Sequence, residues 1–424
     1  MSVARRAIRL RMYPNQAQRE QIRVSCAGAA YVWNKALEWR ESAWRMGFKL
    51  PGVYEMKRML PALKRAQPWL RECESSALQQ VFFNLSAAYK RAFDNARHNC
   101  IVSRKRNRKT GSVTNLYGFP RYKSRKRGYG RSYHITNNPV RVRFVDERHI
   151  KLPKLGMVRV RGYRRFQGRI TGATVKELAC GAYELVLHVE CEDFRQMPAP
   201  FRDVTGVDVG SRKLAVASDG SVFENRKALV GHAKRLARVQ RSLSRKQRGS
   251  ANYEKCRKRK ARLERRIADT RHDAQNKASF EIVRDSQAVV VETLNVVGML
   301  SNHRVAKCMS DAGVSELLRQ LRYKCAWYGR DLIEAGQWFP SSRTCSVCGE
   351  RNDELRSEET WVCPVCGTRH DRDLNAARNL EAYGRSQIAN GFVTVGRDTP
   401  EPATQRVANA CGEPSGGGSE TVAA

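Results

Sequence analysis

The stretch CPVCGTRHDRDLNAARNL, residues 363–380, contains a pair of cysteines, two aspartates separated by one arginine, and a run with helical spacing. If a helix begins close to Asp373, the side chains three, four and seven residues further on lie on the same side of the helix as that aspartate. These residues are Ala376, Ala377 and Leu380. Such a small apolar face can approach a sheet closely, so the sequence predicts that Asp373 is turned inward.

Asp371 takes a different place in the same pattern. Extended back by one turn, the helix would put Asp371 on the side of Leu374, Asn375 and Arg378, which is a mixed face. We therefore expect Asp371 to meet solvent or the cysteine cluster, and the two aspartates not to be interchangeable. His370 is expected to lie at the surface, with a contact to nucleic acid as the alternative.

The cysteines around this stretch have the spacing of a zinc site. Cys345 and Cys348 form one pair, Cys363 and Cys366 form a second pair after 14 intervening residues, and a glycine directly follows each pair. This spacing is typical of a four-thiolate zinc ribbon, so one structural Zn2+ with no open position for catalysis is predicted. Chance spacing or two disulfides are the alternatives. The other nine cysteines are scattered singly, which does not indicate a disulfide framework.

The composition predicts a polyanionic partner. The chain has 424 residues, with 79 Lys and Arg against 41 Asp and Glu, a formal net charge of +38. Nucleic acid is the leading candidate for such a partner, and a membrane surface is the alternative. The sequence holds no apolar run approaching about 18 residues, and its start lacks the apolar core of a signal peptide. We expect a soluble intracellular protein with no membrane partner.

The positive charge is concentrated in two stretches. Residues 104–169 hold 21 Lys and Arg against two acids, interleaved with tyrosines and phenylalanines, and residues 226–271 hold 18 against three. A charged run is often only a solvated face of a protein, but the net charge of +38 favours binding to nucleic acid.

Hydrophobic patterning divides the chain into two parts. The first part contains a strand at 3–13, a helical region that includes 76–99, and alternating runs from 140 to 192 that predict a small barrel or sheet. The second part is predicted as strand, strand, strand, helices, strand, helix, strand, helix. Its segments are DVTGVDVG (203–210), KLAVASDG (213–220), SVFEN (221–225), two basic arms (about 230–246 and 253–283), AVVVE (288–292), VSELLRQLRYKCAWYG (314–329), RDLIEA (330–335) and the final helix. From about residue 390 the composition predicts a disordered tail.

Three carboxylates stand at the edges of apolar elements in the second part. Asp208 ends one predicted strand, Glu292 ends another, and the third comes from the pair at 371–373. Each strand-end acid by itself is best interpreted as solvent-exposed, because burying an acid is costly. Together, in this element order, they indicate a ribonuclease-H-like sheet whose carboxylates hold two divalent cations. Mg2+ is the natural choice for oxygen ligands.

Several of these segments, taken in order, resemble one known family. The motifs are RLRMYPNQAQ (9–18), YVWNKALE (31–38), GVDVG (206–210), AVVVE (288–292), TCSVCG (344–349), WVCPVCG (361–367) and HDRDLNAARNL (370–380). They resemble TnpB, the RNA-guided DNA endonuclease of insertion sequences, whose relatives are the type V CRISPR effectors. The resemblance runs from about residue 7 to about 383. Two further stretches are also similar to the family, SDAGVSELLRQLRYKCAWYG (310–329) and QWFPSSRTCSVCG (337–349).

The resemblance implies a multidomain α+β fold. It comprises a RuvC-like, ribonuclease-H-like α/β nuclease domain with an inserted four-cysteine zinc ribbon, and a β-barrel wedge domain with a helical recognition insertion. The implied boundaries are 1–13 and 115–200 for the wedge, 14–114 for the recognition insertion, 201–340 and 369–389 for the nuclease domain, 341–368 for the ribbon and 390–424 for the tail. Asp208, Glu292 and Asp373 then occupy the three RuvC catalytic positions and bind two Mg2+.

The implied activity is metal-dependent hydrolysis of guide-matched double-stranded DNA next to a short motif that flanks the transposon. The guide RNA is encoded near the gene's own end, and the expected location is the prokaryotic cytoplasm, at the nucleoid. Gln79 and Gln80 are candidates for contacting the flanking motif, because glutamine can pair with adenine, although both also fit ordinary polar positions of a helix. The candidates for backbone contacts to RNA and DNA are Arg104, Lys105, Arg121, Lys123, Arg125, Lys126 and Arg127.

Three alternative functions remain on the sequence alone. They are a cleavage-deficient RNA-guided DNA-binding protein, a compact type V CRISPR effector, and a zinc-ribbon DNA-binding transposase that acts without RNA. The presence of all three carboxylates argues against the first. Whether the purified protein carries RNA, and which RNA, separates the other two from the transposon nuclease.

Overall fold

A computed structural model describes residues 4–106, 113–124, 130–163, 166, 168–191, 200, 202–356 and 358–391. The chain divides into two compact units, with described residues 4–191 in the first and 200–391 in the second, and each unit is described by itself. Within the described ranges, no helix has both the length and the apolar character that crossing a membrane requires. The expected disordered tail lies outside the described residues from 392 onward.

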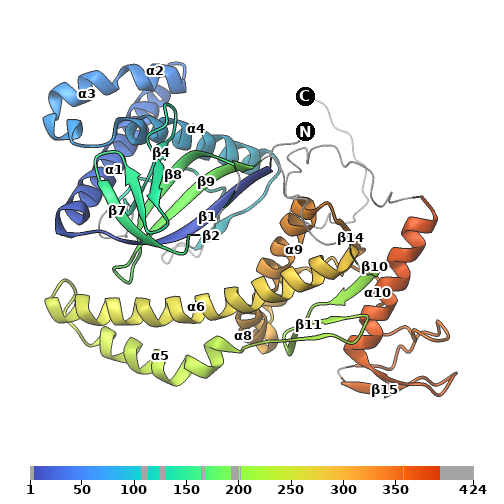
Figure 1. The fold of residues 1–424 in the computed structure, drawn as a ribbon. Helices are drawn as coiled ribbons and strands as arrows, with labels where there is room; N and C mark the ends of the chain where they lie inside the picture. The colour runs from blue at the N-terminus through green and yellow to red at the C-terminus, as the bar shows by residue number, and fades with distance from the viewer. Residues whose placement is uncertain are drawn as a thin grey trace. The chain divides into compact units, whose positions relative to one another are not determined.

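The first unit combines helices with an antiparallel sheet (Figure 1). Its helices are α1 (Gln16–Arg45), α2 (Val53–Arg58), α3 (Leu60–Ala66), the 3-10 helix η1 (Pro68–Arg71) and α4 (Ser75–Arg97). Its strands are β1 (Ala4–Tyr13), β2 (Ser103–Arg106), β3 (Val113–Leu116), β4 (Ser132–Thr136), β5 (Arg143–Asp146), β6 (His149–Leu152), β7 (Gly156–Arg161), β8 (Arg169–Glu177) and β9 (Tyr183–Cys191). The main sheet has the order β4-β8-β9-β1-β7-β6-β5.

Alternation of side chains gives this sheet one apolar and one polar face. Along β9, every second residue from Tyr183 to Cys191 is buried, while the intervening residues, such as His188, are partly exposed. In β1, Leu10 and Met12 are buried and Arg9 is exposed. Helices α1 and α4 pack against each other and contact β4. The sequence pattern predicted this two-faced sheet, because a period of two is a direct consequence of strand geometry.

Two features of the first unit differ from the expectations. The hydrogen-bonded order ends at β4 and β5, which are not paired with each other among the described strands, so hydrogen bonds do not close a barrel there. The region expected to be helical up to residue 114 also contains the hairpin formed by β2 and β3. The predicted strand at the N-terminus is present as β1, and it lies in the interior of the sheet between β9 and β7.

The second unit is built around a mixed sheet with the order β12-β11-β10-β13-β14. Strands β10, β13 and β14 are parallel, and β11 is antiparallel to both β10 and β12. Its strands are β10 (Arg202–Asp208), β11 (Lys213–Ala217), β12 (Val222–Glu224), β13 (Ser286–Glu292) and β14 (Asp331–Ala335), with a hairpin of β15 (Thr360–Val362) and β16 (Arg369–Asp371). Its helices are α5 (Ala228–Ser244), α6 (Ala251–Asp285), α7 (Val296–Ser301), α8 (His303–Ala312), α9 (Val314–Tyr328) and α10 (Arg372–Ala389).

Helices cover both faces of this sheet (Figure 1). On one face, valines of β10 and β13 pack with apolar residues of α6, α8 and α9. On the other face, Val204, Val290 and Ile333 pack with Leu380 of α10. The predicted order of strands and helices from residue 203 to the final helix is present, with α7 and α8 as additional helices.

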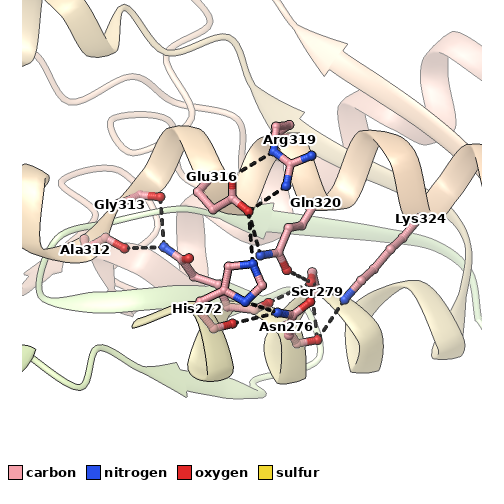
Figure 2. Close-up of polar contacts among 10 residues, drawn as sticks. His272, Asn276, Ser279, Ala312, Gly313, Glu316, Arg319, Gln320 and Lys324 are labelled. Atoms are coloured by element: carbon pink, nitrogen blue, oxygen red, sulfur yellow. Dashed lines mark hydrogen bonds and ion pairs between the residues drawn. The ribbon is translucent and has the colours of Figure 1, made fainter. Parts of the chain in front are cut away.

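A buried polar network joins α6 to α9 (Figure 2). The Lys324 ammonium donates to the carbonyl oxygen of Asn276, with Nζ···O 2.8 Å, and to Ser279 Oγ at 2.7 Å. Gln320 Oε1 lies 2.9 Å from the same serine oxygen, and Gln275 Nε2 donates to the carbonyl oxygens of residues 312 and 313. Lys324 is only 6% exposed, and its contacts among the described residues are uncharged. Burial lowers the pKa of Lys324 from 10.5 to about 8.

We predict that this lysine makes the free energy of unfolding depend on pH above neutrality. Below pH 8 both the folded and the unfolded chain carry the charge, and between about pH 8 and 10.5 the folded chain loses it first. The unfolded state then binds more protons, so stability rises with pH, by up to about 3 kcal/mol for a shift of this size. In Lys324→Met this rise should be absent, and urea denaturation at several pH values measures it.

The matched control is Lys277→Met, which removes an exposed lysine from α6 and should follow the wild-type pH profile. Parallel profiles for wild type and Lys324→Met across this range would show that the buried ammonium does not carry the effect.

Candidate active site and four-cysteine cluster

Strand register brings Asp208 and Glu292 to the same edge of the sheet. Val207 of β10 is paired with Val291 of the parallel strand β13, so the acids that follow them stand side by side at the carboxyl ends of both strands. Because side chains alternate along a strand, Val204, Gly206 and Asp208 all face the same side of the sheet. This is the side that α10 covers. Both acids therefore point toward the helix that contains Asp373.

Helix α10 lies unusually close to β10. A Cβ atom at Gly206 would be 1.9 Å from the carbonyl oxygen of Ala377, so only glycine leaves room for the helix backbone. Further along, a Cβ at Gly384 would be 2.4 Å from Val290 Cγ2. Ala377 and Gly384 are four and eleven residues after Asp373, on the same side of the helix. The small face predicted from the sequence thus packs on the sheet and turns Asp373 toward the strand ends.

These acids line one cavity of about 400 Å3 in the second unit. Its lining also includes basic residues and the β15–β16 hairpin; the charged members are Asp208, Arg212, Lys213, Glu292, Glu358, Glu359, Asp371, Arg372 and Asp373. Burial, with further contributions from the Glu292 and Asp373 carboxylates, raises the pKa of Asp208 to about 8. Such a cluster of carboxylates is costly to ionise unless a cation lies among them.

Lys213 joins the two aspartates of the Asp-x-Asp motif. Its Nζ lies 3.2 Å from Asp371 Oδ2 and 3.4 Å from Asp373 Oδ2. Arg212, the residue before it, forms an ion pair with Glu359, which directly precedes β15. Neither cation was predicted from the sequence, although their place two and three residues after GVDVG could have indicated them.

The expectation that Asp371 meets solvent or the cysteine-containing segment is confirmed, because the residue is exposed and belongs to the hairpin of that segment. The residue is the N-cap of α10 and lies in β16, where it pairs with Thr360, so it does meet the hairpin of the cysteine-containing segment. Its Oδ1 accepts from the backbone N–H groups of Asp373 and Leu374, both at 3.0 Å. It also lines the same cavity as Asp373, because the helix begins one residue after Asp371 and the helix-face argument does not apply to a cap.

The pKa of Asp371 reflects this capping role. Burial acts to raise the pKa, but the hydrogen bond from the Leu374 N–H and the nearby Lys213 ammonium outweigh burial, so the pKa lies below its ordinary value. Asp371 therefore stays ionised through the neutral range and holds the first turn of α10.

The four cysteines of the predicted ribbon come together. The sulfur atoms of Cys345, Cys348, Cys363 and Cys366 all lie within 4.8 Å of one another, with Sγ···Sγ distances of 3.6 Å for 345 and 366 and 3.5 Å for 348 and 363. In a tetrahedral site with Zn–S bonds of about 2.3 Å, neighbouring sulfurs are about 3.8 Å apart. None of the four is in a disulfide. The donor set and its spacing fit one Zn2+.

Both cysteine pairs have the same backbone turn. The N–H of Gly349 donates to the carbonyl oxygen of Cys345, and that of Gly367 donates to the carbonyl oxygen of Cys363, each at 3.0 Å. The two glycines have φ of +78° and +70°, the left-handed region that favours glycine. This backbone conformation explains why a glycine follows each cysteine pair.

The expectation that His370 lies at the surface is wrong. Its side chain is 4% exposed, its Nε2 lies 3.1 Å from Cys345 Sγ, and its ring packs on Trp361 at a centroid distance of 4.8 Å. An imidazole N–H at this distance supports a thiolate in the way that surrounding groups support metal ligands.

Two asparagines of α10 connect the helix to the segment before the first cysteine pair. Asn375 Nδ2 and Asn379 Nδ2 both donate to the carbonyl oxygen of Thr344, at 2.7 and 2.6 Å, and Asn379 Nδ2 lies 2.7 Å from that of Ser341. Ser341 is buried, and its hydroxyl donates to Glu292. Hydrogen bonds thus connect α10 both to the start of the cysteine cluster and, through Ser341, to the Glu292 carboxylate of the cavity. The sequence contains no indication of the role of Ser341, whereas the spacing of Asn375 and Asn379, four residues apart, could have indicated that the two asparagines act together.

The candidate nucleic-acid residues belong mostly to the first unit. Gln79 is exposed on α4, and Gln80 is partly buried with its Nε2 donating to Asn84 Oδ1 at 3.3 Å. Arg125, Lys126 and Arg127 lie outside the described residues. Arg104 and Lys105 belong to β2, of which the structure describes the backbone.

Residues 121–123 lie along α1. The carbonyl oxygen of Arg121 accepts from Trp33 Nε1 at 3.0 Å, and the backbone N–H of Lys123 donates to Asn34 Oδ1 at 2.7 Å. The Lys123 ammonium is 4.2 Å from the centre of the Trp33 ring. Arg121 is exposed, whereas Lys123 is partly buried against that aromatic ring.

The carboxylate cluster fits a hard divalent cation. The side chains of Asp208, Glu292 and Asp373 offer carboxylate oxygens, the type of ligand that Mg2+ prefers in proteins. A cation among them would also relieve the mutual repulsion that raises the pKa of Asp208.

Comparison with known families gives three matches along the chain. Residues 1–49 match a model described as "Helix-turn-helix domain" (HTH_OrfB_IS605), residues 187–303 match "Probable transposase" (OrfB_IS605), and residues 315–380 match "Cas12f1-like, TNB domain". The described part of the first match forms strand β1 and the single long helix α1, with no second helix before residue 49.

Two curated relatives are similar over almost the whole chain. A protein of Streptomyces pristinaespiralis named "Putative RNA-guided DNA endonuclease" is 34% identical over 401 residues, covering 92% of each chain. The "Putative RNA-guided DNA endonuclease InsQ" of Escherichia coli strain K12 is 30% identical over 421 residues, covering 95% of this chain and 98% of the relative.

One solved structure is similar in fold. In the cryo-EM structure of the Cas12f1–sgRNA–target DNA complex, the protein is 12% identical with a TM-score of 0.50, over 89% of this chain and 99% of that chain. The present chain thus has a Cas12f-like multidomain α/β fold with mixed sheets and a four-cysteine cluster. By the identity and coverage of the two curated relatives, together with the matched family models, the chain belongs to the TnpB/IS605 family.

Proposed function

We propose that this protein is an RNA-guided DNA endonuclease that hydrolyses phosphodiesters of guide-matched DNA at a two-metal RuvC-like site. The observation that carries the proposal is the convergence of Asp208, Glu292 and Asp373 on one cavity at the carboxyl ends of parallel strands. The names of the two curated relatives give the same activity for those proteins. The strand order β12-β11-β10-β13-β14 with its antiparallel β11 supports the RuvC-like assignment of the sheet.

In this proposal the three carboxylates hold two Mg2+ ions. Bound there, the ions would supply an activated water and stabilise the leaving oxygen of an in-line displacement. Ser341 fixes one oxygen of Glu292 by donating a hydrogen bond, and Asp371 fixes the first turn of α10 on which Asp373 stands. Arg212 and Lys213 offset part of the negative charge of the cavity through their ion pairs with Glu359, Asp371 and Asp373.

The parts of the chain are assigned accordingly. We propose that residues 201–340 and 369–389 form the nuclease domain, that 341–368 form the zinc ribbon, and that 1–13 with 115–200 form a wedge domain around a recognition insertion at 14–114. The division of the chain into units of described residues 4–191 and 200–391 is compatible with this assignment.

The proposed nucleic-acid partners are a guide RNA encoded near the gene's end and the target duplex next to a transposon-flanking motif. The helical arms α5 and α6 carry much of the 18 Lys and Arg of residues 226–271, which suits contact with the backbone of an RNA–DNA heteroduplex. Gln79 is the better placed of the two glutamines for reading the flanking motif, because it is exposed. Arg121 is likewise exposed for a backbone contact.

We predict that the two aspartates of the Asp-x-Asp motif contribute unequally to cleavage. Asp373→Ala should eliminate cleavage of guide-matched duplex DNA in Mg2+, at least a thousandfold by loss of a metal ligand, while the protein remains folded and RNA-bound. Asp371→Ala should retain a substantial fraction, within about tenfold of wild type, because it removes a helix cap worth about 1 kcal/mol. Cleavage rates of the purified ribonucleoprotein measure both effects.

Asp371→Ser serves as the matched control, since serine can also cap a helix and should restore most of the activity lost in Asp371→Ala. An inactive Asp371→Ala together with an active Asp373→Ala would reverse the assignment of these residues.

We also predict one Zn2+ per chain, held by the four cysteines. Cys363→Ser should lower the zinc content measured by elemental analysis, the midpoint of thermal unfolding and the cleavage rate together, because α10 is hydrogen-bonded to the segment that the cluster organises. Cys308→Ser, at an exposed lone cysteine, should leave zinc content unchanged. Zinc-free wild-type protein with full activity would contradict this prediction.

A further inference from the structure

The first unit contains a second cavity of about 400 Å3, on four adjacent strands of its sheet. It is lined by residues of β1, β4, β8 and β9, namely Arg5, Arg6, Ala7, His134, Thr171, Gly172, His188 and Val189. Strand register places Ala7 opposite His188, and His188 opposite Gly172. Ala7 and Gly172, on either side of His188, are small, so the row of side chains across these strands has a hollow there.

Two imidazoles in this hollow share one hydroxyl group. His134 Nδ1 and His188 Nε2 each lie 3.0 Å from Thr174 Oγ1, and the two rings are edge to face at a centroid distance of 5.1 Å. A Cβ at Gly172 would be 3.0 Å from His134 Cε1 and 3.1 Å from its Nε2, so the His134 ring lies over the glycine. Replacing Gly172 by any larger residue would displace the ring.

Both imidazoles are neutral at physiological pH. Burial, together with the neighbouring His188, lowers the pKa of His134 to about 4, and burial also lowers the pKa of His188. A neutral imidazole has one nitrogen that donates and one that accepts a hydrogen bond.

The shared hydroxyl limits the hydrogen-bonding groups that the two imidazoles have left. Thr174 Oγ1 has one proton and two lone pairs, so it donates to at most one imidazole and accepts from at least one. At least one of the remaining nitrogens, His134 Nε2 and His188 Nδ1, is therefore an acceptor. The edge of a nucleobase carries both donors and acceptors and can complement such a pair.

Arginines surround this hollow on the polar face of the sheet. Arg5 and Arg9 are exposed on β1, two positions before and two positions after Ala7, so all three share one face of the strand. Arg5 and Arg169 both contact the single carboxylate of Glu190, at 3.3 and 3.0 Å, and their side chains are 84% and 78% exposed. Two guanidinium groups on one carboxylate leave a net positive charge beside the cavity, which suits a phosphate.

We propose that this hollow binds one unpaired nucleotide of an RNA, with the His134–Thr174–His188 group contacting the base edge and the arginines holding the adjacent phosphates. RNA is favoured over duplex DNA because folded RNA offers unstacked bases in loops and bulges, whereas a paired base must first be extruded. The site rests on the proposed function only in that a bound RNA supplies its ligand. The hollow belongs to the first unit, whereas the carboxylate cavity belongs to the second.

The test uses the full-length chain and single-stranded homopolymers of adenosine, cytidine and uridine, as RNA and as DNA, in fluorescence titrations. Wild-type protein should prefer one RNA base by about tenfold, a value within the range for contacts to a single base. Thr174→Val, which keeps the side-chain shape, and the double variant H134Q/H188Q should both lose that preference. His149→Gln changes a partly exposed histidine of the same sheet that does not line the hollow, and this variant should keep the preference.

Equal binding of the three RNA bases by wild type, or an unchanged preference in both variants, would overturn the site. A preference for DNA over RNA would overturn the assignment of the ligand. The proposed function is tested separately by whether RNA co-purifies with the wild-type protein and directs cleavage. Wild-type protein that shows the base preference but does not cleave DNA would contradict the nuclease proposal alone. Wild-type protein that cleaves guide-matched DNA but shows no base preference would contradict the proposal for this hollow alone.

Discussion

The direct contact between the backbones of α10 and β10 is the constraint on which the second unit depends. The carbonyl oxygen of Ala377 occupies the place where a side chain at position 206 would be, so the helix rests on the strand itself. A close-packed contact of this kind leaves the helix little freedom to slide or rotate. Asp373, one turn earlier, is thereby held beside the carboxyl ends of β10 and β13, where Asp208 and Glu292 stand.

The cysteine cluster also helps to position the carboxylates, because it is connected to the first turns of α10. Asn375 and Asn379 tie α10 to the backbone just before Cys345, and Ser341 continues the connection to Glu292. A disturbance at the cluster would therefore move two carboxylates of the cavity and not only the hairpin. This arrangement explains why a structural thiolate site lies so close in sequence to an Asp-x-Asp motif.

Sequence patterns predicted what depends on local periodicity. The two-residue period of the strands and the small apolar face of α10 indicated the sheet, its element order and the inward direction of Asp373. The contact of Asp371 with solvent and the hairpin was predicted, but its role as N-cap and its place in the cavity were not, because both depend on the exact residue at which the helix begins. Lys213 and His370 depend on contacts between segments distant in the chain, such as 213 with 371 and 345 with 370, which periodicity does not encode.

Three carboxylates from separate elements are proposed to form a single site for divalent cations, and binding of Mn2+ tests this most directly. Crystals of the protein soaked in Mn2+ should show anomalous density within the cavity, in contact with Asp208, Glu292 and Asp373, and the density should be lost in Asp208→Asn. Density confined to other acidic groups, or density that persists unchanged in Asp208→Asn, would contradict the account.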